Sequence, residues 1–395
     1  MAFCAVLSAQ EEAIVMSTRP DASIEKHFGD LKDPRIDRTK RHKLLDILVI
    51  AICAVICGAD GWTEVAAFGR AKETWFRTFL DLPNGIPSHD TFGRVFAQLD
   101  PAQFTSCFLA WMHALADLLP NQVIPIDGKT LRRSHDRRSG KAAIHMVSAW
   151  AAANQLVLGQ VKVDDKSNEI TAIPELLQAL VLEGCIVTID AMGCQKEIAA
   201  TIVDKGADYL LALKENQGTL YDDVVLLFDD LAQSGYRDYP YDSAETTDKG
   251  HGRVDVRQCW TIAGDAVRCL PSAAEWTALR SVVKVRAERH LPEKTEVETR
   301  YYISSLKGDA EQALRVKRTH WSIENALHWV LDIAFREDES RVRKDNGPEN
   351  LAILRHIALS LLKQDTSIKA GIKGKRLAAG WDEAYLLQVL SPLLN

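Results

Sequence analysis

The sequence lacks four features that would point to whole classes of protein. Its eight cysteines contain no CxxC pair, so neither a zinc ribbon nor a dithiol redox centre is indicated. The longest apolar run, residues 44–59, spans about 16 residues and contains Asp46, whereas a bilayer-spanning helix needs about 20. No signal peptide and no internal repeat are evident. We therefore expect a cytoplasmic protein with reduced cysteines.

Positive charge is not in excess either. The 48 Lys and Arg residues are outnumbered by 54 Asp and Glu residues, which gives a formal net charge of −6. Any nucleic-acid binding must therefore come from local basic patches. The composition, 47% hydrophobic and 26% charged, is that of a globular protein, and 395 residues suffice for two or three domains.

The patterning changes along the chain and predicts six segments. They are a flexible extension (1–25), a helical DNA-binding or associated domain (26–120), the first part of a catalytic core (121–234), a β-rich insertion (235–307), the helical remainder of the core (308–365) and a basic tail with a last helix (366–395). The helical domain is long enough for a helix-turn-helix, although helices alone are weak support for one.

Residues 121–234 carry the clearest fold pattern. Strands are expected at 123–127, 142–153, 155–163, 185–190 and 208–214, with helices before and after the last two. Three strands followed by strand–helix alternation predict a mixed α/β sheet with antiparallel pairs first and parallel additions later. This is the element order of the ribonuclease-H-like fold, whereas a doubly wound nucleotide-binding fold would alternate from its start.

Three distant acids are the candidate catalytic residues. Asp127 and Asp190 end the first and fourth strands, which are neighbours in that fold, and Glu324 lies on a helix expected over 320–332 with Ser322 as its cap. Two adjacent carboxylates raise each other's pKa, and a divalent cation removes that cost. The set suits two Mg²⁺ or Mn²⁺ ions about 3.5–4 Å apart. Alternatively, the acids are strand-end caps and part of a solvated helix face.

Basic, polar and aromatic residues near these acids are the candidate DNA contacts. Gly128 would let the backbone approach a phosphate closely. The alternative is a set of solvated loops and turns. The candidates are Lys129, Arg132, Arg133, Lys214, Asn216, His251, Arg253, Arg318, His320, Trp321 and His328.

Three motifs carry a family resemblance. Ile126-Asp127-Gly128-Lys129, Thr188-Ile189-Asp190-Ala191-Met192-Gly193 and His320-Trp321-Ser322-Ile323-Glu324-Asn325 resemble the acidic motifs of DDE transposases, and more narrowly the ISAs1 insertion-sequence family with its H-repeat-associated proteins. Further matching segments, such as residues 58–62, 85–92 and 380–382, extend the resemblance over nearly the whole chain after about residue 25.

The resemblance implies a Mg²⁺-dependent DNA transposase of a bacterial mobile element. Such an enzyme cuts and joins double-stranded DNA at the terminal inverted repeats of its element and at a target. It has a β-rich insertion between the second Asp and the Glu. Since joining two ends requires a paired complex, a homodimer on DNA is expected, associated with the nucleoid.

The wider group often has Tyr, Arg and Lys at −7, −4 and +7 from the Glu. Here these positions hold Lys317, His320 and Leu331. The usual phosphate contacts would then fall to other residues, with Arg318, His320 and His328 as candidates. Two alternatives stay open: a catalytically inactive, transposase-derived DNA-binding protein, and a structure-selective nuclease that hydrolyses without joining.

Overall fold

The computed structural model describes residues 22–116, 120–135, 142–163, 168–235, 237, 239–250 and 252–394. These residues form two compact units. The first unit combines the described residues up to Ala116 with those from Ile333 onward, and the second lies within Leu118–Asp332. Among the described residues, no helix has both the length and the apolar character needed to cross a membrane.

The first unit is all-helical, and its centre is the contact between α3 and α14. The Asn350 side chain on α14 donates to the carbonyls of Phe96 (2.7 Å) and Leu99 (3.0 Å). These two residues lie at the C-terminal end of α6. Helix α14, which the sequence pattern predicts as part of the catalytic core (308–365), packs against α3, α6, α7, α15 and α16, and most of its residues are buried. The helices of the unit are α2 (Ile24–Phe28), α3 (Leu44–Ile56), α4 (Trp62–Ala71), α5 (Glu73–Phe76), α6 (His89–Gln98), α7 (Pro101–Leu115), α14 (Gly347–Gln364), α15 (Ile372–Trp381) and α16 (Glu383–Leu394).

The second unit is built on one nine-stranded sheet. Its order is β3-β2-β1-β4-β5-β9-β8-β7-β6, in which β1 pairs antiparallel with β2 and parallel with β4. The antiparallel start and the parallel additions confirm the predicted mixed α/β class. The strands are β1 (Val123–Leu131), β2 (Ile144–Ala151), β3 (Leu156–Val163), β4 (Ile186–Ile189), β5 (Asp208–Leu213), β6 (Tyr241–Gly250), β7 (Arg253–Ala263), β8 (Ser281–His290) and β9 (Thr295–Ser304).

The β-rich insertion continues the same sheet. Strand β9 pairs antiparallel with β5, and β9, β8, β7 and β6 follow as successive antiparallel neighbours. The sequence pattern missed β6 because none of its residues is buried. Its half-buried face carries Ala244, Thr246 and Asp248, which do not give the alternation of large apolar and polar residues that reveals a strand.

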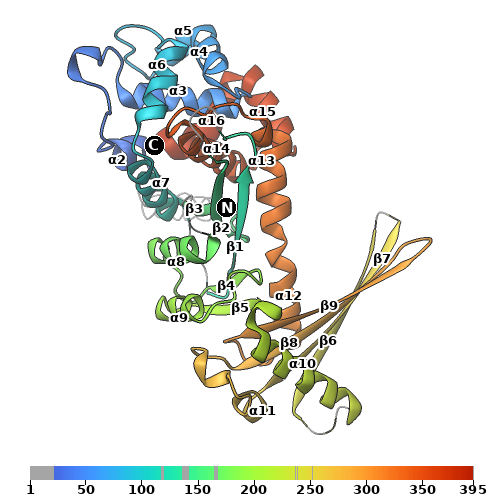
Figure 1. Cartoon of the computed structure of the whole chain (residues 1–395). Helices are drawn as coiled ribbons and strands as arrows, with labels where there is room; N and C mark the ends of the chain where they lie inside the picture. Colours follow the sequence, from blue (N-terminus) through green and yellow to red (C-terminus); the bar gives the residue numbers. More distant parts are fainter. Residues whose placement is uncertain are drawn as a thin grey trace, which may run out of the picture. The chain divides into compact units, whose positions relative to one another are not determined.

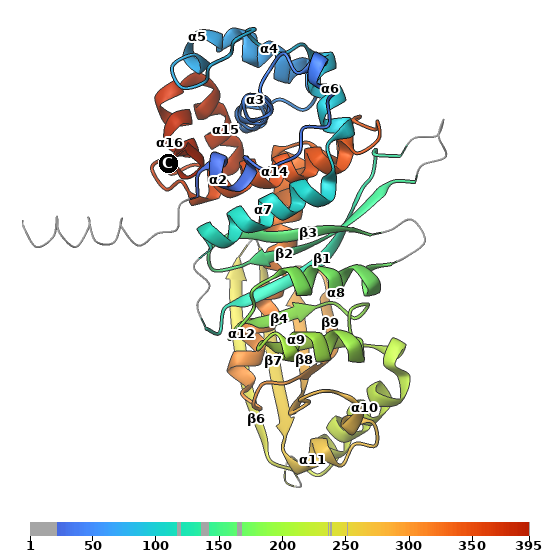
Figure 2. The same cartoon turned by 90° about the vertical axis from the view of Figure 1, so that its left-hand side faces the viewer.

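Helices cover the two faces of the sheet, and Figure 1 shows α8 and α9 on one side and α12 on the other. Figure 2 shows α8 and α9 from in front. Helix α8 begins at Glu169, because the Asn168 side chain accepts from the Ile170 amide (3.0 Å) and caps it. The helices of this unit are α8 (Glu169–Ala179), α9 (Lys196–Asp204), α10 (Gly218–Gln233), α11 (Asp265–Arg268) and α12 (Ala310–His320), and α13 (Trp329–Ala334) follows them at the unit boundary.

Helix α12 is anchored across most of the sheet. Its apolar side chains, among them Leu314 and Val316, join one buried cluster with residues of β1, β4, β5, β7, β8 and β9. Burial of such side chains is worth about 1.5–3 kcal/mol each. The helix that leads to Glu324 is therefore held firmly against the strands that carry Asp127 and Asp190.

Candidate active site

The register of two parallel strands brings the two aspartates together. Ile126 on β1 is the Cα partner of Ile189 on β4, so Asp127 and Asp190 follow paired residues. The sequence pattern predicted that Asp127 ends its strand, but the strand continues beyond it. β4 stops at Ile189, but β1 continues to Leu131 because its other edge still pairs with β2.

The third acid lies on a helical segment that differs from the predicted one. Ser322 does not cap a new helix, because α12 starts at Ala310 with Asp309 as its cap and the chain remains helical beyond His320 apart from a turn at Trp321. Glu324–His328 then forms a π-helical turn before α13. Such turns are rare in proteins and are frequent at functional sites.

One histidine lies between two of the acids. The Nδ1 atom of His328 is 3.3 Å from Glu324 Oε2 and 3.4 Å from Asp127 Oδ2. Ligand atoms of these three residues all lie within 4.8 Å of one another. The imidazole is buried, whereas the Glu324 side chain is 56% exposed.

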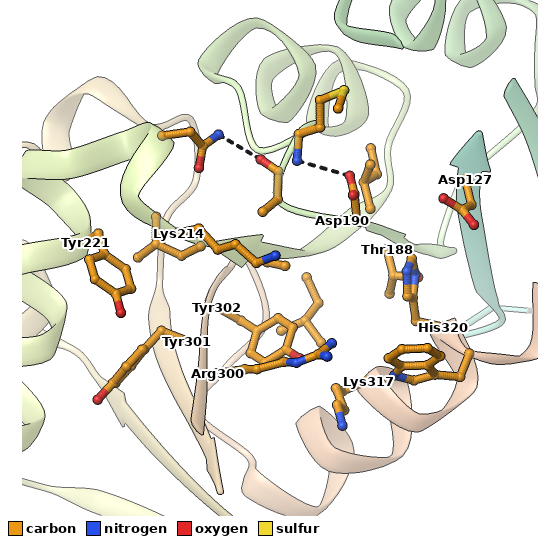
Figure 3. A pocket seen from close by; sticks show the side chains of 18 of the residues that line it. Asp127, Thr188, Asp190, Lys214, Tyr221, Arg300, Tyr301, Tyr302, Lys317 and His320 are labelled. Atoms are coloured by element: carbon orange, nitrogen blue, oxygen red, sulfur yellow. Dashed lines mark hydrogen bonds between the residues drawn. The ribbon is translucent and has the colours of Figure 1, made fainter. Parts of the chain in front are cut away.

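All three predicted acids line one cavity of about 1040 Å³, and Figure 3 shows Asp127 and Asp190 at the same end of it. Asp190 Oδ1 accepts from the amides of Met192 (3.0 Å) and Gly193 (3.4 Å), which fixes this carboxylate against the loop after β4. The cavity lies wholly within the second unit.

The electrostatics of Asp127 show that this end of the cavity suits a cation. Burial is the main cause that raises the pKa of Asp127 to about 7. The neighbouring carboxylates Asp190, Glu169 and Glu324 contribute to this value, and the hydrogen bond from the Gly128 amide opposes it. Several acids gathered at one place are stable in their charged form only beside a compensating positive charge. The donor set of carboxylate oxygens therefore fits a divalent cation such as Mg²⁺ or Mn²⁺.

The opposite wall of the cavity is cationic and aromatic. Figure 3 shows Arg300 and Tyr302 of β9 together with Lys317 of α12. Burial lowers the pKa of Lys317 to about 8, with a further contribution from the Arg300 guanidinium. The sequence pattern missed Arg300 and Tyr302 because they lie 24 and 22 residues before Glu324, in the insertion, and only sheet pairing brings them close.

The other candidate residues fall into two groups. Four of them line the cavity with the acids: Lys214, Asn216, His320 and Trp321. His320 Nδ1 lies 3.0 Å from Thr188 Oγ1, and the Asn216 amide donates to the Ala191 carbonyl (2.8 Å), so both also support the framework. The Arg300 guanidinium lies 5.3 Å from the centre of the half-exposed Trp321 ring.

The second group lies away from this cavity. Arg318 pairs with Asp248 (2.8 Å) and lines a different cavity, and Arg253 pairs with Asp255 (3.2 Å) on the insertion hairpin. Arg132 and Arg133 are exposed after β1, and His251 lies outside the described residues. The structure thus does not bring Arg318 or Arg253 to the acids.

The sequence pattern did not predict a row of hydrogen-bonded side chains close to Asp127, formed by Thr130, His145 and Glu169. His145 Nδ1 lies 2.8 Å from Thr130 Oγ1, and its Nε2 lies 2.6 Å from Glu169 Oε1. This pair covers Gly128: a Cβ atom there would lie 2.2 Å from Glu169 Oε1 and 2.5 Å from His145 Nε2. Glycine is therefore required next to Asp127 to make room for the His145–Glu169 pair.

Gly128→Ala should displace that pair and slow DNA cleavage about tenfold or more, because the backbone beside Asp127 must shift. The loss should be non-additive with Glu169→Ala, since both changes disrupt one pair. Cleavage rates of the two single variants and the double variant measure this coupling. Fully additive losses would show that Gly128 acts independently of the pair.

Lys129 forms an ion pair with Asp332, which links the strand of Asp127 to the helix of Glu324. If this link positions the acids, Lys129→Ala and Asp332→Ala should each lower the cleavage rate about tenfold, and the exchange Lys129→Asp with Asp332→Lys should recover part of it. If Lys129 acts only on DNA, Asp332→Ala should leave the rate unchanged. Rates at two salt concentrations separate these outcomes.

Comparison with known proteins agrees with this architecture. A family model described as "Transposase DDE domain" matches residues 119–361, and one described as "DDE_Tnp_1-associated" matches residues 25–112. The chain is 41% identical over 372 residues to "Putative transposase YncI" of Escherichia coli O157:H7, covering 93% of this chain and 94% of that protein. It is 40% identical over 371 residues to "H repeat-associated putative transposase YhhI" of Escherichia coli strain K12, covering 93% and 97%.

A solved structure, the piggyBac transposase synaptic complex with hairpin DNA, is a more distant match. The TM-score is 0.43 with 10% sequence identity, over 94% of this chain and 80% of that chain. This likeness is too remote to support an inference about the present chain.

Proposed function

This chain belongs to the DDE-domain transposase family, and from that membership we propose that it is the transposase of an insertion sequence, cleaving DNA at the ends of its element and joining the freed 3′-hydroxyl to a target. Asp127, Asp190 and Glu324 are the proposed catalytic residues. The observation that carries the proposal is that these acids, 63 and 134 residues apart, line one cavity.

The proposed role of the acids is to hold two divalent cations, Mg²⁺ or Mn²⁺. When bound, such ions activate the attacking oxygen and stabilise the leaving oxygen of a phosphodiester. Asp127 and Asp190 supply oxygens from adjacent strands, and Glu324 supplies one from the helix across the sheet. The raised pKa of Asp127 supports this role, because burial and, to a lesser extent, the neighbouring carboxylates disfavour its negative charge, and a bound cation would remove that cost.

The cationic wall is proposed to hold the DNA. Lys317, Arg300 and Lys214 line the cavity with the acids and would place a phosphate against them. Lys129, Arg132, Arg133, Asn216, His251, Arg253, Arg318, His320, Trp321 and His328 remain proposed contacts to DNA or to its supporting framework. The proposed partners are the terminal inverted repeats, target DNA and a second copy of the chain.

A plasmid that carries the gene with its flanking DNA tests the proposal. The purified full-length protein with Mg²⁺ should nick or cut at discrete positions flanking the gene, and a labelled end fragment should become joined to a second plasmid. EDTA should abolish both products. Binding without any cleavage would overturn the catalytic proposal in favour of a silent DNA-binding protein, and cleavage without joining would identify a nuclease.

A further inference from the structure

The proposed function gives His328 only a general role as a contact to DNA or its framework, although its Nδ1 atom lies near both Asp127 and Glu324. Its side chain is only 5% exposed, and its Nδ1 atom is nearly equidistant from Asp127 Oδ2 and Glu324 Oε2. The π-helical turn Glu324–His328 presents both His328 and Glu324 to the strand of Asp127. The arrangement therefore requires an explanation that involves all three residues.

Hydrogen bonding alone does not provide that explanation. Strong charge-assisted hydrogen bonds measure about 2.7–2.9 Å, whereas the two distances from His328 Nδ1 are 3.3 and 3.4 Å. A single Nδ1–H can also point at only one of the two oxygens. In contrast, two ligand atoms that are each about 2.1–2.2 Å from one cation, at an angle of about 90–110°, lie about 3.0–3.6 Å apart. The observed spacing is that of ligands sharing a cation.

We propose that His328 Nδ1 is a ligand of the cation held by Asp127 and Glu324, which gives this position a mixed nitrogen and oxygen ligand set. The proposal rests on the proposed function, in that the same two acids bind the cation there. Imidazole suits first-row transition metals better than Mg²⁺. The position should therefore prefer Mn²⁺ to Mg²⁺, while a position held by carboxylates alone would show less preference.

Pulsed electron paramagnetic resonance of the full-length protein with Mn²⁺ alone tests this ligand directly. A directly coordinated imidazole nitrogen modulates the Mn²⁺ echo. The modulation is expected in the wild type and in His320→Gln, a matched control whose imidazole lies in the same cavity bonded to Thr188. It should be absent in His328→Gln, whose dissociation constant for Mn²⁺ should rise at least about tenfold.

The possible results test the role of His328 separately from the role of the three acids. Mn²⁺ bound without nitrogen modulation, or modulation that survives in His328→Gln, would overturn the role of His328 and leave the three acids untouched. Loss of Mn²⁺ binding in Asp127→Asn with a normal circular dichroism spectrum would support the shared site. If the wild type binds no Mn²⁺, this inference fails, and Mg²⁺-dependent cleavage then decides the proposed function separately.

Discussion

Asp190→Asn should abolish Mg²⁺-dependent cleavage, lowering the rate at least about 10³-fold, while the fold is retained. Asparagine preserves the side-chain oxygen that accepts from the amides of Met192 and Gly193, so the loop after β4 keeps its support. It removes the negative charge that the proposed site needs. Stabilisation by a bound metal contributes several kcal/mol to such a reaction, and about 4 kcal/mol corresponds to 10³ in rate.

The measurement is the single-turnover cleavage rate on the plasmid that carries the flanking DNA. Asp222→Asn is the matched control, because Asp222 is an exposed acid on α10 outside the cavity. The control should cut as fast as the wild type. If Asp190→Asn also cuts at the wild-type rate, Asp190 is not a catalytic ligand and the three-acid site is wrong.

Asp127→Asn should stabilise the metal-free protein at pH 8 but hardly at all at pH 4. Folding raises the pKa of Asp127 from its ordinary 3.8 to about 7. Folding therefore favours the protonated carboxyl. Its contribution to stability is fully present below about pH 4 and is lost as the pH rises through 7, a change of the order of a few kcal/mol. Asparagine mimics the neutral acid at every pH.

The difference in thermal midpoint between wild type and Asp127→Asn isolates this effect from the other titrating groups. Without metal, the variant should melt several degrees above the wild type at pH 8, and the difference should shrink toward pH 4. Mg²⁺ should raise the midpoint of the wild type at pH 8 and have little effect on the variant. A difference that does not change with pH would show that folding does not raise the pKa of Asp127.

The outline of the α/β fold could be predicted from the sequence because it depends on local patterns. Apolar strands before Asp127 and Asp190 and amphipathic helices between them are short-range signals, and only one common fold has that order of elements. The three acids could be named on the same basis, together with the motifs around them.

Other features depended on pairings between distant residues. Strand β6 has no fully buried residue and no large apolar residue on its half-buried face, so only its pairing with β7 defines it. Helix α14 is buried over most of its length, and its contacts with α3, α6 and α7 place it in the first unit.

The sequence by itself pointed to Asp127, Asp190 and Glu324 as the candidate acids, because each lies in a motif that is recognisable from its own neighbours. Only the tertiary structure decided what surrounds them. Glu169 and His145 behind Gly128, Arg300 on the insertion strand and His328 beside Asp127 all reach the site by long-range pairing. Side chains that approach from separate elements share no spacing in the sequence, so sheet register and helix packing alone set their distances.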